Sequence, residues 1–311
     1  MKKPKAKLLT RSLRIQDSRY IGDHTYKCGH RVPIFEVSSV HALNQLIGHA
    51  KFNNSTYGSI LYRGECRLYE TLIPSLFRNC SRVSNKASQL TRILNKIMAD
   101  NKMCNNLKLD LEDTIVAKAK TEGLLQHYGI PTRYLDVVDN HWVALWMGLH
   151  ESKLYGKRPG YYHYTKRELP LGQIAEGLPL LSESLYQYIV LIAVPYSSDD
   201  KRDGVICADR FICVDLRQSL PSVFLRPHAQ HGLVVRKKLT QELAPSDYDM
   251  ATEVVGILKV RIDIAGQWLG SGDLLTQDNL FPPPSYDQGY EILLMRDDLF
   301  DSSMFRIAKY V

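Results

Sequence analysis

The sequence lacks an uninterrupted apolar run of about 18 residues, so we expect no membrane span and no membrane partner. The first seven residues include four lysines. They are not followed by the apolar stretch and small-residue cleavage site of a secretory signal. We therefore expect a cytoplasmic protein.

Cysteine pairs with C-x-x-C spacing are also absent. The six cysteines are scattered along the chain, which is typical of reduced cytosolic thiols and not of a disulfide framework or a zinc knuckle. His24, Cys28 and His30 would be candidate metal ligands, but no second half of such a site follows downstream. We interpret that segment as a loop and expect no metal.

Several nucleotide-binding and catalytic motifs are missing as well. The sequence has no G-x-x-x-x-G-K-[ST], G-x-G-x-x-G, G-x-S-x-G or H-E-x-x-H. Their absence argues against a P-loop NTPase, a dinucleotide-binding dehydrogenase, an α/β-hydrolase and a zincin.

The composition is that of a globular protein with a substantial core. The chain has 311 residues, of which 44% are hydrophobic and 23% charged, enough for one large domain or two ordinary ones. A formal charge of +7 permits an anionic partner, such as nucleic acid, a nucleotide or an acidic protein.

The most informative stretch is residues 126–136, Gln-His-Tyr-Gly-Ile-Pro-Thr-Arg-Tyr-Leu-Asp. Gly129 gives the backbone freedom that a helix exit needs, and Pro131 blocks further helix. Residues 132–138 are rich in β-branched and apolar side chains, which predicts a buried strand.

Many polar side chains lie beside this turn, which is typical of the wall of a binding site. The alternative is a structural network in which His127 caps the helix and Arg133 pairs with Asp136. Residue types alone do not separate these two interpretations.

A second candidate site lies at the end of a strand predicted over residues 57–63. The guanidinium of Arg63 can hold a phosphate or carboxylate through two parallel hydrogen bonds. Gly64 would let a ligand or another strand approach the backbone closely. The alternative is a surface salt bridge from Arg63 to Glu65 or Glu70.

A third candidate site lies within residues 226–235, where a polar pair and a glycine lead into a strand. Gln230 and His231 would lie near the sheet edge, within reach of a ligand.

Hydrophobic periodicity outlines the remaining elements. Helices are predicted from Ser38 and over residues 90–98, 109–126 and 140–149, and strands over 186–194, 211–216, 254–264 and 290–295. Residues 156–182 show no clear period and are interpreted as an insertion.

Together these blocks resemble the FRG domain, a family named for an (F/Y)-R-G motif. The blocks that carry the resemblance are Tyr62-Arg63-Gly64, residues 72–78, residues 124–136, Ala144-Leu145, Arg226, residues 229–233 and residues 280–282. The resemblance covers about residues 36–290. A basic lead-in over residues 1–35 precedes it, and a C-terminal strand or tail over 291–311 is expected to pack on the domain.

The order of these elements is similar to that of an ADP-ribosyltransferase. The resemblance implies an α+β fold, with a mixed β-sheet core and a helical subdomain between the first strand and the block at residues 126–136. It also implies NAD as the substrate and no metal.

The resemblance further implies roles for individual residues. Arg63, between Tyr62 and Gly64, is expected to contact an NAD phosphate or ribose. The residues expected to line the nicotinamide pocket or hold the pyrophosphate are Gln126, His127, Tyr128, Thr132 and Arg133. The catalytic candidates are Arg63, His127, Asp136 and Gln230. Gln230 stands where the family of transferases usually offers an acidic residue, so Asp136 is expected to supply the carboxylate.

The leading hypothesis is an NAD-dependent ADP-ribosyltransferase that modifies a macromolecule, with nucleic acid favoured over protein and RNA over DNA. FRG proteins resemble components of bacterial antiviral and toxin–antitoxin loci, which implies a toxin with a neutralising antitoxin protein as its partner. One alternative is a non-catalytic nucleotide- or nucleic-acid-binding sensor in the same setting. A transferase that modifies proteins and a nuclease are the others.

Overall fold

The computed structural model has a large mixed β-sheet, a small second sheet and several helices packed against them. It describes residues 5–78, 80, 83–155, 161–170, 182–195, 201–239, 244–270, 274–300 and 305–310. In this part of the chain, no helix combines the length and the apolar character that crossing a bilayer requires.

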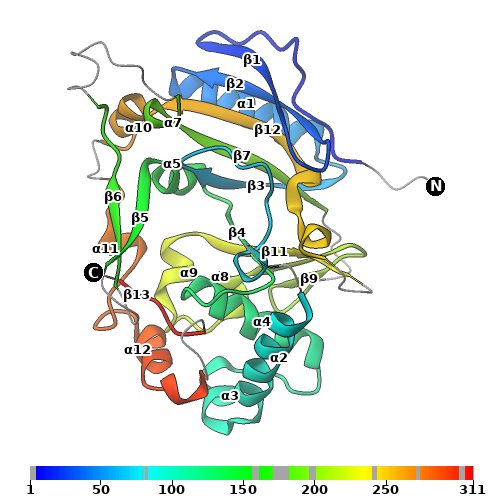
Figure 1. The fold of residues 1–311 in the computed structure, drawn as a ribbon, viewed down its shortest axis with the longest axis vertical. Helices are drawn as coiled ribbons and strands as arrows, with labels where there is room; N and C mark the ends of the chain where they lie inside the picture. Colours follow the sequence, from blue (N-terminus) through cyan, green and yellow to red (C-terminus); the bar gives the residue numbers. More distant parts are fainter. Residues whose placement is uncertain are drawn as a thin grey trace.

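The large sheet has ten strands in the order β1-β2-β12-β7-β3-β4-β11-β10-β9-β8 (Figure 1). These strands are β1 (Ser18–Thr25), β2 (Arg31–Val37), β3 (Gly58–Glu65), β4 (Leu135–Val138), β7 (Tyr186–Pro195), β8 (Lys201–Arg202), β9 (Val205–Cys207), β10 (Phe211–Asp215), β11 (Gly232–Lys237) and β12 (Val254–Arg261). Strands β2 and β12 run parallel, whereas the other described pairs of neighbours are antiparallel.

The helices lie in two groups, above and below the middle of the sheet in Figure 1. The longer ones are α1 (Val40–Asn53), α2 (Val83–Ala99), α4 (Thr114–His127) and α5 (His141–Leu149); the shorter ones are α3 (Asn101–Leu107), α7 (Ser182–Leu185), α8 (Leu216–Ser219), α9 (Leu225–Ala229), α10 (Ile262–Trp268), α11 (Gln277–Leu280) and α12 (Gln288–Leu294). Helices α1 and α5 share one hydrophobic core with β3, β7 and β12. Helices α2, α3 and α4 share another with β9, β10 and β11. The prediction of helices between the Arg63 strand and residues 126–136 is therefore confirmed.

The predicted helix after Ser38 begins with a side-chain cap. The Ser39 hydroxyl accepts a hydrogen bond from the Ala42 amide, which satisfies one of the free donors of the first turn. Leu43, Leu46 and Ile47 then bury one face of α1 against the sheet. The regular spacing of these side chains explains why the sequence predicts this helix well.

The glycine of the Tyr-Arg-Gly motif has a packing role. A Cβ atom added at Gly64 would lie 1.8 Å from the Ala144 carbonyl oxygen and 2.7 Å from the Gly148 nitrogen. Helix α5 therefore crosses β3 with backbone against backbone. The sequence predicts a close approach at Gly64, and the approaching group is a helix.

Strands β3 and β4 meet at a single residue pair, Tyr62 and Val138. On its other edge β3 pairs with β7 along its whole length. Strand β4 in turn pairs with β11, from Gly232 opposite Val138 onward. The large sheet thus consists of two halves joined by a short junction.

The N-terminal region differs from the lead-in expected over residues 1–35. Strands β1 and β2 form an antiparallel hairpin, and β2 joins the sheet beside β12. Val32, Phe35 and Val37 on β2 are fully buried. The strand β2 was not predicted because Pro33 and two charged residues interrupt the apolar pattern of its sequence.

The C-terminal region also differs in part. A strand was predicted over residues 290–295, but residues 290–294 belong to helix α12 and Met295 is its C-cap; the Asp287 side chain caps the first turn. The last strand is β13 (Lys309–Tyr310), which pairs with β6 (Tyr161–Lys166) in the small sheet beside β5 (His150–Tyr155). Strand β6 lies within the insertion for which the sequence predicts no regular structure.

A buried arginine links the C-terminal region to the centre. Arg226 has 0% exposure, and its guanidinium lies 4.4 Å from the Tyr128 ring centroid and 4.7 Å from that of Tyr290. The Tyr128 hydroxyl donates to the fully buried Asp287 over 2.6 Å, and the Ala308 amide donates to the Tyr128 carbonyl. These contacts hold three distant parts of the chain on residues 127–128.

The close approach at Gly64 leads to a stability prediction. Gly64→Ala should destabilise the fold by about 1–3 kcal/mol or more, because the new methyl group meets backbone that cannot rotate away. Gly48→Ala is the matched control, since nothing lies within 4 Å of its added Cβ in the exposed middle of α1. That change should stabilise by roughly 0.5–1 kcal/mol. Thermal unfolding of both variants provides the measurement, and equal melting temperatures would contradict the proposed contact.

Candidate functional site

A cavity of about 490 Å³ lies at the C-terminal end of β3, beside β4. Its wall is built from β3, the turn after α4, β4, helix α5, the β5–β6 hairpin and the segments around Gln230 and Phe281. The predicted site residues that line it are Tyr62, Arg63, Gly64, Gln126, His127, Asp136 and Gln230. Segments far apart in the sequence therefore meet at one cavity of a size typical of small-molecule sites.

Arg63 lies in the wall with its guanidinium partly engaged. Nε donates to a carboxylate oxygen of Glu65, and Nη1 donates to the Asp136 carbonyl oxygen over 2.9 Å. The Arg63–Glu65 pairing of the alternative interpretation is therefore present, but it is not a surface pair, since the two side chains are only 18% and 9% exposed. Nη2 has no acceptor among the described residues and remains available to a ligand.

Asp136 is held by residues of the turn. The Gln126 side-chain amide donates to its Oδ2, and the Thr132 hydroxyl donates to the Gln126 Oε1 over 2.7 Å. Burial raises the pKa of the Asp136 carboxyl above its ordinary value of 3.8, although the positive charge of Arg63 and the Gln126 hydrogen bond act in the opposite direction. The carboxyl group is thus held in a fixed orientation by Gln126.

His127 contributes a neutral ring. Burial, assisted by the charge of Arg226, lowers the pKa of His127 to about 3, so the imidazole carries no proton charge near neutral pH. A Cβ atom added at Gly232 would lie 2.5 Å from its Cε1, so Gly232 makes room for the ring. Its Nε2 is buried and has no partner among the described residues.

Gln230 is buried and has one fixed contact. Its amide nitrogen donates to the Leu280 carbonyl oxygen over 2.6 Å. Its Oε1 accepts no hydrogen bond from the part of the chain that the structure describes. Gln230 therefore contributes a polar acceptor to the cavity wall and holds the segment that carries Phe281.

Three predicted site residues lie outside this cavity. Tyr128 is fully buried in the Arg226 cluster, and Thr132 contacts the site only through Gln126. Arg133 makes a two-pronged ion pair with Glu122, which is 1% exposed. The pairing with Asp136 that a structural network would require is absent between these described residues. Arg133 is thus paired with Glu122 and is not among the residues that line this cavity.

Arg78 also lines the cavity, although the sequence analysis placed it only in the block at residues 72–78 and gave it no role in the site. Its Nε donates to the Ile73 carbonyl oxygen, and its two Nη atoms have no acceptor among the described residues. Arg78 is an exposed residue, but neighbouring groups partly desolvate its guanidinium, and this desolvation together with the nearby charge of Arg63 lowers its pKa. Arg78 is the last residue of the block at residues 72–78. Its place in that block was the only feature of the sequence that could have pointed to a role in the site.

An aromatic wall was also missed. Tyr164 and Phe281 stack with ring centroids 4.4 Å apart, and Tyr69 and Tyr162 line the same cavity. Tyr162 and Tyr164 come from the hairpin, Phe281 follows α11, and Tyr69 follows β3; the sequence gave no reason to place these segments together. Flat apolar faces beside two guanidinium groups suit a planar heterocycle that carries phosphate.

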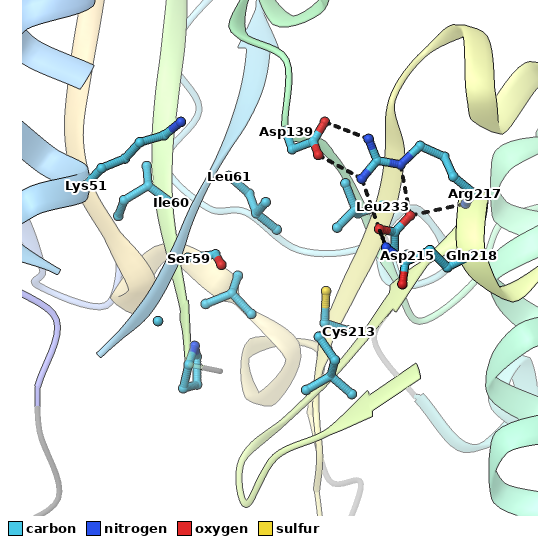
Figure 2. Close-up of a pocket in the computed structure, with 14 residues that line it drawn as sticks. Lys51, Ser59, Ile60, Leu61, Asp139, Cys213, Asp215, Arg217, Gln218 and Leu233 are labelled. Atoms are coloured by element: carbon cyan, nitrogen blue, oxygen red, sulfur yellow. Dashed lines mark hydrogen bonds and ion pairs between the residues drawn. The ribbon is translucent and has the colours of Figure 1, made fainter. Parts of the chain in front are cut away.

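A second cavity of about 500 Å³ lies on the other side of the Tyr62–Val138 junction. Figure 2 shows Arg217 facing Asp139 and Asp215, with Lys51 on the opposite wall. Arg217 donates to both carboxylates over 2.7–3.0 Å and contacts His231 as well. Every guanidinium nitrogen of Arg217 is thereby engaged, so we place the functional site in the first cavity.

The described residues include no group of three or more His, Cys, Asp or Glu side chains that could hold a metal ion. His24 and His30 instead contact the backbone carbonyls of Tyr69 and Val254. All six cysteines are free thiols.

The raised pKa of Asp136 predicts an unusual stability effect. The folded state binds this proton more tightly than the unfolded chain, so stability is lost as pH rises through the raised pKa. Asp136→Asn stays neutral and keeps an acceptor for Gln126. Its melting temperature should exceed that of the parent near neutral pH and match it in acid.

Asp113→Asn is the matched control for this measurement. Asp113 caps α4, and its hydrogen bond from the Val116 amide lowers the pKa of its carboxyl. Replacing it should give no gain in melting temperature near neutral pH. A lower melting temperature for Asp136→Asn than for the parent would contradict the burial argument.

Comparison with known proteins gives one match. Residues 58–155 match the FRG domain family, a narrower span than the 36–290 expected from the motifs. No curated protein and no solved structure matches the chain. The matched segment supplies Arg63, Gln126, His127 and Asp136 of the cavity, whereas Gln230 and Phe281 come from outside it. The chain thus carries an FRG domain match, and its candidate site is built around that segment.

Proposed function

We propose that this protein is an NAD-dependent ADP-ribosyltransferase that modifies a macromolecular acceptor, with nucleic acid favoured. The observation that carries the proposal is the pairing of two partly unengaged guanidinium groups, Arg63 and Arg78, with an oriented carboxylate, Asp136, in one cavity. The resemblance of the motif order to ADP-ribosyltransferases adds to it.

The two arginines supply the anion-binding part of the site. The two Nη atoms of Arg78 and the Nη2 of Arg63 together can bind a pyrophosphate. Their mutual repulsion, which contributes to the lowered pKa of Arg78, would be relieved by a bound anion. This argument favours a dinucleotide over a neutral substrate.

The aromatic wall and the amides supply the rest of the binding site. The Tyr164 and Phe281 rings offer a face on which a nicotinamide or adenine ring can stack. Gln126 and Gln230 lie within the same wall and can bind an amide or a ribose hydroxyl.

The carboxylate of Asp136 accounts for the chemistry. Cleavage of the nicotinamide–ribose bond develops positive charge on the ribose, which a nearby carboxylate stabilises. The same carboxylate can accept the proton of the attacking acceptor group. Glu65 carries the other carboxylate in the wall. Because it forms an ion pair with Arg63, we propose that it positions that arginine and does not take part in the chemistry.

A non-catalytic nucleotide sensor is the second candidate. It is favoured by Gln230, because the late motif supplies an amide, fixed on Leu280, where a transferase usually has an acid. The sensor would bind NAD and leave it intact. Release of nicotinamide by the purified protein distinguishes the two candidates.

The anion-binding role predicts the effect of arginine substitutions. Arg63→Ala and Arg78→Ala should each weaken NAD binding about tenfold or more, since each removes a charge-assisted contact to phosphate. Arg19→Ala is the control, because this arginine is 77% exposed on β1, away from the cavity. Calorimetric titration with NAD gives the affinities. Unchanged NAD affinity in both cavity variants would exclude this site.

The catalytic role of Asp136 predicts loss of turnover with binding retained. Asp136→Asn should reduce nicotinamide release and label transfer from NAD to RNA, DNA or protein by roughly 100-fold or more, a scale typical of losing a catalytic base. Activity of the parent should fall in acid, as the raised pKa of Asp136 is crossed and the base becomes protonated. If the residual activity of Asp136→Asn falls in acid just as that of the parent does, the pH dependence belongs to another group.

The biological setting is part of the same proposal. The resemblance to FRG proteins of defence loci supports a growth-arresting toxin restrained by an antitoxin protein. Induced expression should then arrest bacterial growth for the parent and not for Arg63→Ala, at equal protein levels.

A further inference from the structure

The β5–β6 hairpin has two faces of different character. Residues directly opposite each other in an antiparallel pair share a face, and successive pairs alternate between faces. Ser152 with Tyr164 belongs to the face that lines the first cavity. Lys153 with His163 and Tyr155 with Tyr161 therefore belong to the opposite face, termed here the outer face.

The outer face exposes rings and a cation. Tyr155 is 53% exposed and Tyr161 49%, which is unusual for large side chains on a regular strand. His163 is exposed as well, and its ring lies 6.3 Å from that of Tyr155. The Lys153 side chain is 50% exposed. Glu151, opposite Thr165, lies on the same outer face, and its 3.6 Å pairing with Lys153 is a surface contact of small energy.

The hairpin also lies at the rim of the candidate site. Strand β5 is the terminal strand of the small sheet, so no described strand pairs with its outer edge. The opposite face of the same two strands, through Ser152, Tyr162 and Tyr164, forms the cavity wall. A polymer lying across the outer face can therefore reach around this edge into the cavity.

We propose that the outer face of the β5–β6 hairpin binds the single-stranded nucleic acid acceptor of the transferase reaction and directs one nucleotide into the cavity. Neighbouring tyrosine rings can stack on successive bases whatever their sequence, and Lys153 can contact a phosphate. This inference rests on the proposed function for its purpose, but the binding itself is independent of NAD.

The outer face has more aromatic rings than positive charges, so we expect it to bind nucleic acid mainly by stacking. A surface with one lysine displaces few counterions, so the affinity should depend weakly on salt and strongly on the tyrosines. This signature separates a stacking platform from non-specific binding by the basic chain as a whole.

The test uses the full chain and fluorescently labelled oligonucleotides of about 12 nucleotides, oligo-U RNA and oligo-dT DNA. The variant is Lys153→Ala with Tyr155→Ser and Tyr161→Ser. Its control is Lys102→Ala with Phe52→Ser, which removes an exposed cation on α3 and a 78% exposed ring on α1. Fluorescence anisotropy gives the dissociation constants, and thermal unfolding confirms that both variants fold.

The hairpin variant should raise the dissociation constant at least tenfold, and the control should stay within about twofold. Tighter binding of RNA or of DNA identifies the acceptor class. No binding to either oligonucleotide by the parent, or equal loss in both variants, overturns the inference and favours a protein on this face.

Nicotinamide release without oligonucleotide keeps the two proposals separate. The hairpin variant should retain it, because these side chains point away from the cavity, while transfer to nucleic acid falls. A second outcome is that the parent binds the oligonucleotide but does not cleave NAD, and that the hairpin variant loses the binding. This outcome would support the hairpin inference and reject the transferase.

Discussion

The hydrogen bond from Arg63 Nη1 to the Asp136 carbonyl spans the junction on which the site depends. Strands β3 and β4 share only the Tyr62–Val138 pair there, so this side chain supplements a very short ladder. The same guanidinium is held by Glu65 and faces the cavity. The contact that joins the two halves of the sheet therefore also sets the spacing between the anion-binding group and the carboxylate.

Local chemistry made the central turn predictable. Gly129 has a φ of 90°, which suits a helix exit, and strand β4 follows Pro131 but begins at Leu135, three residues later than predicted. Hydrophobic pattern alone placed Arg63 and Asp136 on two strands, and only the family resemblance brought them into one expected site; both line the same cavity. The α+β core with helices before residues 126–136 was likewise an expectation from the resemblance, and the mixed sheet and the helices α2, α3 and α4 agree with it.

Other features depend on pairings between distant segments, which no local pattern reveals. Arg133 pairs with Glu122 of helix α4. The sequence analysis had considered Asp136 as its partner, because Asp136 is the carboxylate nearest to Arg133 along the chain. Arg78 lines the cavity directly after a 3-10 helix, η1 (Ser75–Phe77), and no local pattern points to this position. Strands β1, β2 and β6 have polar or proline-interrupted sequences and acquire their structure from neighbouring strands.

The cluster around Arg226 bears on how this domain can be divided. Tyr128 belongs to the FRG match, yet its hydroxyl, ring and carbonyl are held by Asp287, Arg226 and the amide of Ala308. Strands β3 and β4 likewise complete their ladders with β7 and β11, both beyond residue 155. A fragment cut at the limits of the match would leave buried polar groups and strand edges open to water. The segment that matches the FRG domain family is thus the middle of a folding unit, and its transfer into another protein would require the flanking strands as well.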